Sequence, residues 1–344
     1  MTMTRIEPKT NIKLGVVPTH IQFVDGLVPD DAGNMPRDEA GQIKVVSGMK
    51  RLVDLADAKM SCVQVSLFPG VTDSDYEEMV KGLEALGLEV HLILMAGGAG
   101  DPMNPADESA VVDCLVECLN AASKHGIKTV SSTSLEPWMA PDAKRKEGAE
   151  FEAAMDQIAT VHVKACEQAK ITETSIDSWH IEFLRDIEFS TFTDLGRAWQ
   201  VVQKANAAMG KPFFKVLIDA AHCGDSKLTL DQNIQLIEEI GANDGLSVFH
   251  ASAKTTRGCI STDDGWIGAL MAACAKTGKL NYVYGEMFHH QDPALEALRT
   301  AVPGHGVDTT DGRSYDQMLA DSVNILARRL NNFASREIKG VAAS

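Results

Sequence analysis

The chain has 344 residues, of which 44% are hydrophobic and 23% are charged, and its formal net charge at pH 7 is −16. An acidic surface repels phosphate groups, and no apolar run reaches the roughly 18 residues that cross a bilayer, so nucleic-acid binding and membrane insertion are both disfavoured. The seven cysteines are dispersed without a CxxC pair, which indicates reduced thiols and a cytoplasmic location.

Short runs of apolar and β-branched residues alternate with amphipathic helical stretches along the whole chain. This alternation is typical of repeated βαβ units that build a parallel sheet. From the N-terminus, strands are expected at residues 13–21, 62–68, 89–95, 128–135, 175–183, 213–219, 245–250 and 281–286.

Helices are expected between these strands, and several begin after an Asp, Ser or Thr that can cap the first turn. The clearest helical segments are residues 73–86, 107–125, 148–169, 192–208, 230–240 and 315–332. Eight strands with helical crossovers predict a single (β/α)8 TIM barrel over residues 1–344. A doubly wound sheet of the Rossmann type is the alternative, but no glycine fingerprint follows the first strand.

Three segments depart from the repeat. Residues 22–45, rich in Asp, Gly and Pro, predict a long loop after the first strand, which is either a lid on the active face or a surface excursion. The glycine-rich residues 97–100 after the third strand form either a phosphate cradle or a tight connection. Residues 335–344 are expected to be a C-terminal tail.

Four polar residues end the last four predicted strands, namely Glu182, Asp219, His250 and Glu286. Successive members are about one βα unit apart, and the carboxyl ends of barrel strands meet at one face, so we expect the four side chains to converge. The alternation of side chains along a strand also turns Lys215 inward below Asp219. That position requires either a carboxylate partner at the barrel floor or a bulge in the sixth strand.

Three converging carboxylates repel one another in a partly dehydrated pocket unless a divalent cation holds them ionised. A set of three carboxylates and one imidazole favours Mn²⁺, with Mg²⁺ or Co²⁺ as alternatives, over a structural zinc that would recruit thiolates. His250 taken alone is equally well explained as a hydrogen-bonded core residue. The four residues together predict a metal site.

Two local motifs accompany this set. Glu182-Phe-Leu-Arg-Asp-Ile-Glu188 and Asp219-Ala-Ala-His222 resemble segments of the xylose-isomerase-like superfamily, and especially of its tagatose/psicose 3-epimerase group. Arg257 follows the strand that ends at His250, close to where that group carries an arginine. The resemblance implies a metal-dependent sugar isomerase or epimerase that acts on a small carbohydrate and assembles as a homo-oligomer, a dimer or a tetramer.

The resemblance also assigns roles to single residues. Glu182 and Glu286 are implied to bind the metal and to act as the catalytic pair, one removing a proton next to a carbonyl and the other returning one. Glu188, His222 and Arg257 are implied to bind substrate oxygens.

Further residues are candidates for the pocket wall. His20, near the end of the first strand, and Trp138, in the loop after the fourth, are two of them, and ordinary packing explains each equally well. His289 and His290 follow Glu286 and, being adjacent, are expected to point in different directions. Together with the length of the chain they motivate a metal-dependent lyase, acting on an oxidised sugar or keto-glycoside, as the alternative activity.

Two alternatives from other functional classes are an abasic-site endonuclease of the same superfamily and a non-catalytic sugar-binding barrel. The endonuclease needs a histidine-rich site for several zinc ions and a basic DNA-binding face, and the net charge of −16 argues against it. Only the complete ligand set argues against the non-catalytic barrel.

Overall fold

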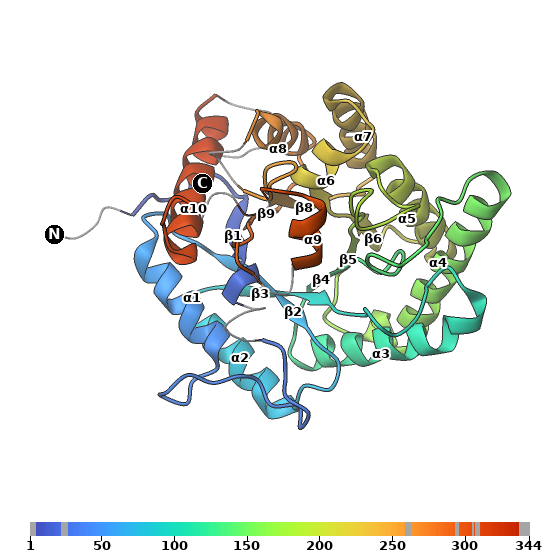
Figure 1. Cartoon of the computed structure of the whole chain (residues 1–344), viewed down its shortest axis with the longest axis horizontal. Helices are drawn as coiled ribbons and strands as arrows, with labels where there is room; N and C mark the ends of the chain where they lie inside the picture. The colour runs from blue at the N-terminus through green and yellow to red at the C-terminus, as the bar shows by residue number, and fades with distance from the viewer. Residues whose placement is uncertain are drawn as a thin grey trace.

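The computed structural model describes residues 5–21, 27–258, 263–292, 296–304, 306 and 310–336. In this part of the chain, parallel strands form one sheet that curves into a ring, with the long helices on its outer side (Figure 1). The order of the strands around the sheet is β6-β5-β4-β3-β2-β1-β9-β8-β7. Their bounds are β1 Lys13–Val17, β2 Cys62–Leu67, β3 Glu89–Leu94, β4 Thr129–Ser132, β5 Ser178–Ile181, β6 Phe214–Val216, β7 Ile218–Asp219, β8 Val248–Ala251 and β9 Tyr282–Glu286. The predicted (β/α)8 barrel is confirmed, with the sixth predicted strand divided in two.

The division of the sixth strand lies at Leu217, between β6 and β7, which are the two edges of the sheet. The Leu217 N–H donates to the carbonyl of Ile181 at 3.0 Å, and the Val216 N–H donates to the carbonyl of Gly245 at 2.7 Å. The chain at this point therefore bonds to both neighbours, the segment before β8 and the end of β5, and so nearly closes the ring between the two edges of the sheet.

Lys215, whose inward position the sequence left unexplained, has a partner near the amino end of β8. Its Nζ lies 3.1 Å from the Asp244 carboxylate and donates to the Asp244 carbonyl at 2.8 Å. The expected carboxylate partner is therefore present.

Eight long helices cover the ring in the described part of the chain, and short helical turns join some of them to the strands. Side chains of Thr72, Asp194 and Ser314 accept the backbone N–H three residues ahead and so fix the starts of three helices. The long helices are α1 Lys44–Leu55, α2 Asp73–Ala85, α3 Glu108–Lys124, α4 Gly148–Gln168, α5 Leu195–Met209, α7 Leu230–Ala242, α8 Trp266–Lys276 and α10 Tyr315–Ser335, and the short turns are η2 Pro105–Asp107, η3 Ile171–Glu173, α6 Ala220–Asp225 and α9 Glu296–Ala301.

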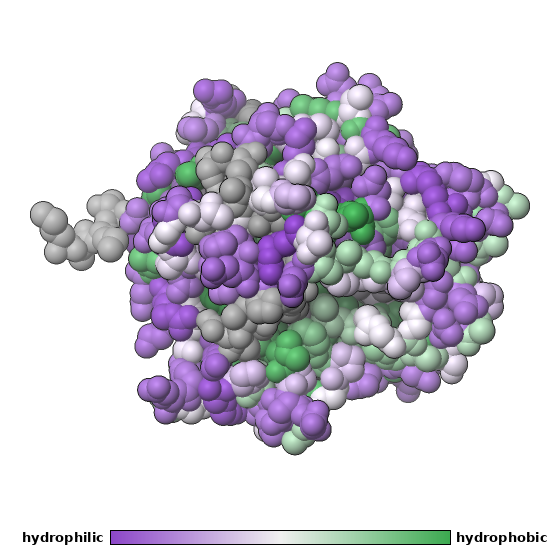
Figure 2. Space-filling model, viewed as in Figure 1, coloured by the Kyte–Doolittle hydropathy of each residue, from purple (hydrophilic) through white to green (hydrophobic). Residues whose placement is uncertain are grey.

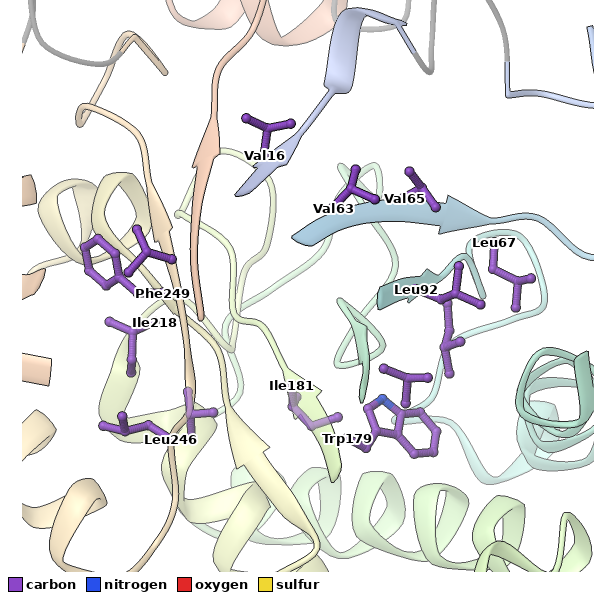
Figure 3. Close-up of a cluster of buried hydrophobic side chains, with 14 of the residues drawn as sticks. Val16, Val63, Val65, Leu67, Leu92, Trp179, Ile181, Ile218, Leu246 and Phe249 are labelled. Atoms are coloured by element: carbon purple, nitrogen blue, oxygen red, sulfur yellow. The ribbon is translucent and has the colours of Figure 1, made fainter. Parts of the chain in front are cut away.

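The main hydrophobic core lies between the sheet and the helices. Val63, Val65 and Leu67 of β2 belong to it, together with Trp179 of β5 (Figure 3). The alternate residues of β2 turn into the ring, where Gln64 donates from Nε2 to Ser131 Oγ of β4 at 2.7 Å. The interior of the barrel is therefore partly polar and hydrogen-bonded, and this polar layer supports the site above it.

The predicted segments outside the repeat have mixed outcomes. Of the long loop at residues 22–45, residues 22–26 lie outside the described part, and α1 already begins at Lys44. Arg37 pairs with Asp75 and Glu78, so the described part of this loop is fastened to α2. The helix α10 continues through residue 335, and residues 337–344 of the predicted tail are not among the described ones. None of the described helices has the length and apolar character that a membrane crossing requires.

Candidate metal centre

The four predicted ligands converge at one end of the ring. Asp219 and Glu286 are the last residues of β7 and β9, His250 lies on β8, and Glu182 follows β5 directly. Each offers one ligand atom, and these atoms all lie within 4.8 Å of one another. All four residues are buried, with exposed fractions between 0% and 7%. The predicted convergence is confirmed, because parallel strands deliver their carboxyl ends to the same face.

The imidazole of His250 is surrounded by the three carboxylates. Its Nδ1 lies 3.4 Å from Glu286 Oε2, 3.7 Å from Glu182 Oε1 and 3.9 Å from Asp219 Oδ2. Nδ1 of His250 and Oε1 of Glu182 are buried, and neither has a hydrogen-bond partner among the described residues. Buried polar atoms normally have a partner, so these two atoms indicate that a cation, which they would bind as ligands, is the missing partner.

The other ring nitrogen of His250 is fixed by Gln64, a residue that the sequence did not single out. His250 Nε2–H donates to Gln64 Oε1 at 2.6 Å, and Gln64 Nε2 donates onward to Ser131. This bond leaves the lone pair of a neutral His250 on Nδ1, directed at the carboxylates. Such an orienting partner is usual for a histidine that binds a metal. The signal in the sequence was a polar residue at an inward position of the apolar strand β2.

In the absence of a cation, the carboxylates and the imidazoles of this group stabilise one another's charged forms. Burial lowers the pKa of His250, but the neighbouring Glu286 and Glu182 outweigh it and raise that pKa to about 10. Burial raises the pKa of Glu182, but the His222 and His250 imidazoles reverse the effect and bring it to about 2. The pKa of Asp219 is held above its usual value, chiefly by burial. An added positive charge is what this set of carboxylates would stabilise most.

The donors fit a divalent cation that prefers oxygen ligands. Three carboxylates and one imidazole nitrogen lie close enough to share one ion, and the histidine already presents the correct nitrogen. The candidate centre is therefore Glu182, Asp219, His250 and Glu286.

Arg257, predicted to bind substrate oxygens, lies against two of these carboxylates. Its Nη1 donates to Asp219 Oδ2 at 2.9 Å and to Glu286 Oε2 at 3.1 Å, and Nη2 donates to His222 Nε2 at 2.6 Å. The residue is only 4% exposed, and its backbone has a φ of 55°, a left-handed conformation that is uncommon outside glycine. The protein thus places its own cation beside the candidate ligands.

His222 and Glu188 extend the centre on the side of Arg257. The backbone N–H of His222 donates to Asp219 Oδ1 at 2.9 Å in the first turn of α6, and the ring Nδ1 of His222 lies 3.3 Å from Glu182 Oε1. Glu188 accepts from Arg185 Nε at 3.0 Å, and its Oε2 lies 4.0 Å from His222 Nε2. Both predicted substrate-binding residues therefore adjoin the candidate ligands.

The two predicted wall residues have different surroundings. The indole N–H of Trp138 donates to Glu188 Oε1 at 3.0 Å, which connects this residue to the candidate centre. The ring of His20 stacks on that of His289, with 4.4 Å between ring centroids. The rings of His289 and His290 also stack on each other, at 4.6 Å, so the expectation that they diverge is wrong.

Comparison with known proteins gives likenesses of structure. No protein-family model matches the chain, and no curated protein matches it by sequence. D-allulose 3-epimerase from Methylomonas sp., solved with D-allulose, matches with a TM-score of 0.68 and 13% identity over 94% of this chain and 99% of that one. An L-ribulose 3-epimerase matches with a TM-score of 0.70 and 14% identity, covering 95% of this chain and 96% of that one.

A sugar phosphate isomerase/epimerase from Parabacteroides distasonis also matches, with a TM-score of 0.59 and 10% identity over 92% of this chain and 96% of that one. Identities this low show the fold alone. The xylose-isomerase-like resemblance that the motifs indicated is confirmed as a likeness of fold.

Proposed function

We propose that this chain is a divalent-metal-dependent sugar isomerase or epimerase. The observation that carries the proposal is the buried group of Glu182, Asp219, His250 and Glu286, in which His250 Nδ1 and Glu182 Oε1 face one another without hydrogen-bond partners. The structural neighbours whose names are sugar epimerases and isomerases support the same class of reaction. Mn²⁺ suits this donor set best, with Mg²⁺ or Co²⁺ as alternatives.

The proposed chemistry is the transfer of a proton next to a carbonyl group. A bound divalent cation would polarise the carbonyl and acidify the neighbouring C–H bond. Glu182 is the better candidate for the base, because its Oε1 has no hydrogen-bond partner among the described residues, whereas Glu286 Oε2 accepts from Arg257 at 3.1 Å. Glu286 would return a proton from the other side, and His222, Glu188 and Arg257 would hold substrate hydroxyls. Return to the opposite face gives epimerisation, and transfer between carbon and oxygen gives isomerisation.

The remaining parts of the proposal rest on the sequence. The resemblance of the motifs supports a small carbohydrate substrate and assembly as a homodimer or homotetramer. The βα repeat supports one barrel domain over residues 1–344, and the dispersed cysteines support a cytoplasmic location. The net charge of −16 supports a substrate that is not a polyanion.

A lyase that uses the same carboxylates is the second candidate. The observation that favours it is the stack of His20, His289 and His290. Two of these histidines follow β9 within four residues of Glu286, and they add further groups that can transfer a proton. Elimination from an oxidised sugar or keto-glycoside would need such a group to protonate the departing oxygen.

The test combines metal analysis with isotope exchange. We expect the purified protein to bind close to one equivalent of Mn²⁺ and to introduce deuterium at C2 or C3 of at least one free ketose in deuterated water. A protein that retains less than about a tenth of an equivalent of any divalent metal, even after titration, would contradict the metal site. Turnover of keto-glycosides without exchange into any free ketose would replace the epimerase with the lyase.

A further inference from the structure

A cavity of about 320 Å³ lies between the loops that follow β3 and β4, on the face of the barrel that carries the candidate metal centre. Leu94, Pro102 and Val111 contribute apolar surface to it, and Glu136 and Trp138 contribute polar groups. Its volume lies at the lower end of the range of small-molecule sites, roughly 300 to 1,000 Å³. In the space-filling view, pale and green residues lie to the right of and below the middle, next to a purple group, and purple residues dominate the outline (Figure 2).

Trp138 connects this cavity with the candidate centre. The residue is 45% exposed, and its indole N–H is held by Glu188 Oε1 at 3.0 Å. Glu188 in turn lies 4.0 Å from His222, which lies 3.3 Å from the candidate ligand Glu182. Glu188 therefore contacts both His222, beside the candidate centre, and Trp138, which lines the cavity.

The one ionisable side chain in the described lining of the cavity is acidic, and this favours an uncharged ligand over an anion. The buried carboxyl group of Glu136 lines it, with Oε1 accepting the N–H groups of Thr191 and Phe192 at 2.8 Å each. Among the described residues that line the cavity, none is basic. A phosphate would meet a carboxyl group without a compensating cation, so the lining disfavours the phosphate cradle that the sequence of residues 97–100 allows.

The chemistry of the walls fits a ring that bears hydroxyl groups. The exposed, hydrogen-bonded indole of Trp138 offers a flat apolar face in a fixed orientation. Glu136 and Ser134 offer polar atoms for hydroxyl groups, and the apolar residues cover the remaining surface. A pyranose and a phenol share this combination of a flat face and hydroxyl groups.

We propose that this cavity binds a second, uncharged ring of the substrate. The preferred substrate is then a sugar linked to another ring, a disaccharide or a glycoside, and a free monosaccharide fills only the part of the site at the metal centre. This inference rests on the proposed function, because the first ring occupies the candidate metal centre.

Gly97 allows the cavity to be filled without strain. It lines the cavity, its φ is outside the left-handed region, and a Cβ added there meets no atom within 4 Å. The substitution Gly97→Leu therefore adds a side chain at the mouth of the cavity, and Gly97→Ala is the smaller matched change. Trp138→Ala removes the flat face, whereas Trp138→Phe keeps a smaller flat ring and loses the hydrogen bond to Glu188.

The experiment is calorimetric titration of the Mn²⁺-loaded protein with matched one-ring and two-ring ligands. D-fructose is compared with turanose, maltulose and isomaltulose, which carry a glucose ring at C3, C4 and C6 of fructose. Methyl β-D-glucoside is compared with phenyl β-D-glucoside, which separates an aryl ring from a sugar ring. We expect at least one two-ring ligand to bind at least ten times more tightly than its one-ring counterpart. Gly97→Leu and Trp138→Ala should each cancel that gain, with Gly97→Ala and Trp138→Phe in between.

Equal affinities for one-ring and two-ring ligands would overturn the inference, as would a gain that survives either Gly97→Leu or Trp138→Ala. Mn²⁺ stoichiometry and deuterium exchange are measured on the same samples. If the metal and the exchange are present and the second-ring gain is absent, only this inference fails. If the metal itself does not bind, the proposed function fails.

Discussion

At the scale of single residues, Gln64 controls which nitrogen of His250 is available to a cation. The glutamine is fully buried and receives the Nε2–H of His250 at 2.6 Å. Loss of this acceptor would release the ring from its orientation and leave the N–H unsatisfied. Partners of this kind typically change metal affinity by about 10- to 100-fold.

We therefore predict that Gln64→Leu weakens Mn²⁺ binding by about 10- to 100-fold. Gln64→Glu keeps an acceptor for the histidine and should bind the ion at least as tightly as the unchanged protein. Titration calorimetry measures both, with circular dichroism to verify the fold. Equal affinities for the leucine variant and the original protein would show that the hydrogen bond has no part in the centre.

The two glutamates of the proposed catalytic pair give a second prediction at this scale. Glu182→Gln and Glu286→Gln keep the size of each side chain but remove the group that accepts and returns a proton. Each should lower the turnover number by roughly 10²- to 10⁴-fold while the fold is kept. Deuterium exchange measures the effect, and Glu84→Gln on the exposed side of α2 is the control. Exchange at the original rate in either variant would exclude the paired mechanism.

The residues of the candidate centre differ in how far the sequence could predict them. Glu182, Asp219, His250 and Glu286 each lie at the carboxyl end of an apolar strand, and such a position has a fixed place in a parallel barrel. Gln64 lies on β2, far along the chain from His250, and its role depends on a contact across the ring. No spacing in the sequence encodes that contact.

At the scale of elements, the break at Leu217 joins the two edges of the sheet. Leu217 is fully buried inside the ring, in a cluster with Val17, Val248 and Tyr284. Periodicity predicted the strand but not its division, because the pattern of side chains does not reveal which neighbouring strand each N–H group bonds.

This position gives a prediction about stability. Leu217→Ala should lower the free energy of unfolding by about 2 to 5 kcal/mol, because it opens a cavity within a closed ring. Leu217→Met preserves the volume and should cost less than about 1.5 kcal/mol. Urea unfolding followed by circular dichroism measures both changes. A loss below about 1 kcal/mol for the alanine variant would mean that the ring collapses to fill the space.

The start of α5 shows why helix boundaries were harder to predict. The sequence suggested a beginning at Phe192, but the helix begins at Leu195. The N–H groups of Thr191 and Phe192 both donate to Glu136 in the loop after β4, and Asp194 caps the helix instead. A carboxyl group more than fifty positions earlier in the chain thus fixes this boundary.

At the scale of the whole molecule, two buried histidines make stability depend on pH. Burial lowers the pKa of His162 to about 4 and that of His180 to about 3, whereas an unfolded chain would titrate near 6.5. Above pH 6.5 both states are neutral at these positions. As the pH falls, the unfolded state binds protons that the folded state excludes, so stability decreases from about pH 6.5 down to each folded pKa.

We predict that His162→Gln makes the loss of stability between pH 6.5 and 4 shallower by up to about 3 kcal/mol. Loss of the 2.7 Å hydrogen bond between His162 and Ser134 lowers stability across this pH range alike and so leaves the slope unaffected. Urea unfolding at a series of pH values measures the slope. His125, which is only partly buried, is the control position, and an unchanged slope for His162→Gln would count against the neutral buried state.

The bond between Gln64 and His250 also bears on whether the barrel can be divided into exchangeable modules. All four candidate ligands lie on or directly after β5, β7, β8 and β9, whereas Gln64 and Ser131 lie on β2 and β4. A chimera that took only the second half of this chain would inherit every donor atom but not the acceptor that turns the imidazole toward them. Transfer of the centre to another barrel therefore requires Gln64 and Ser131 to move with it.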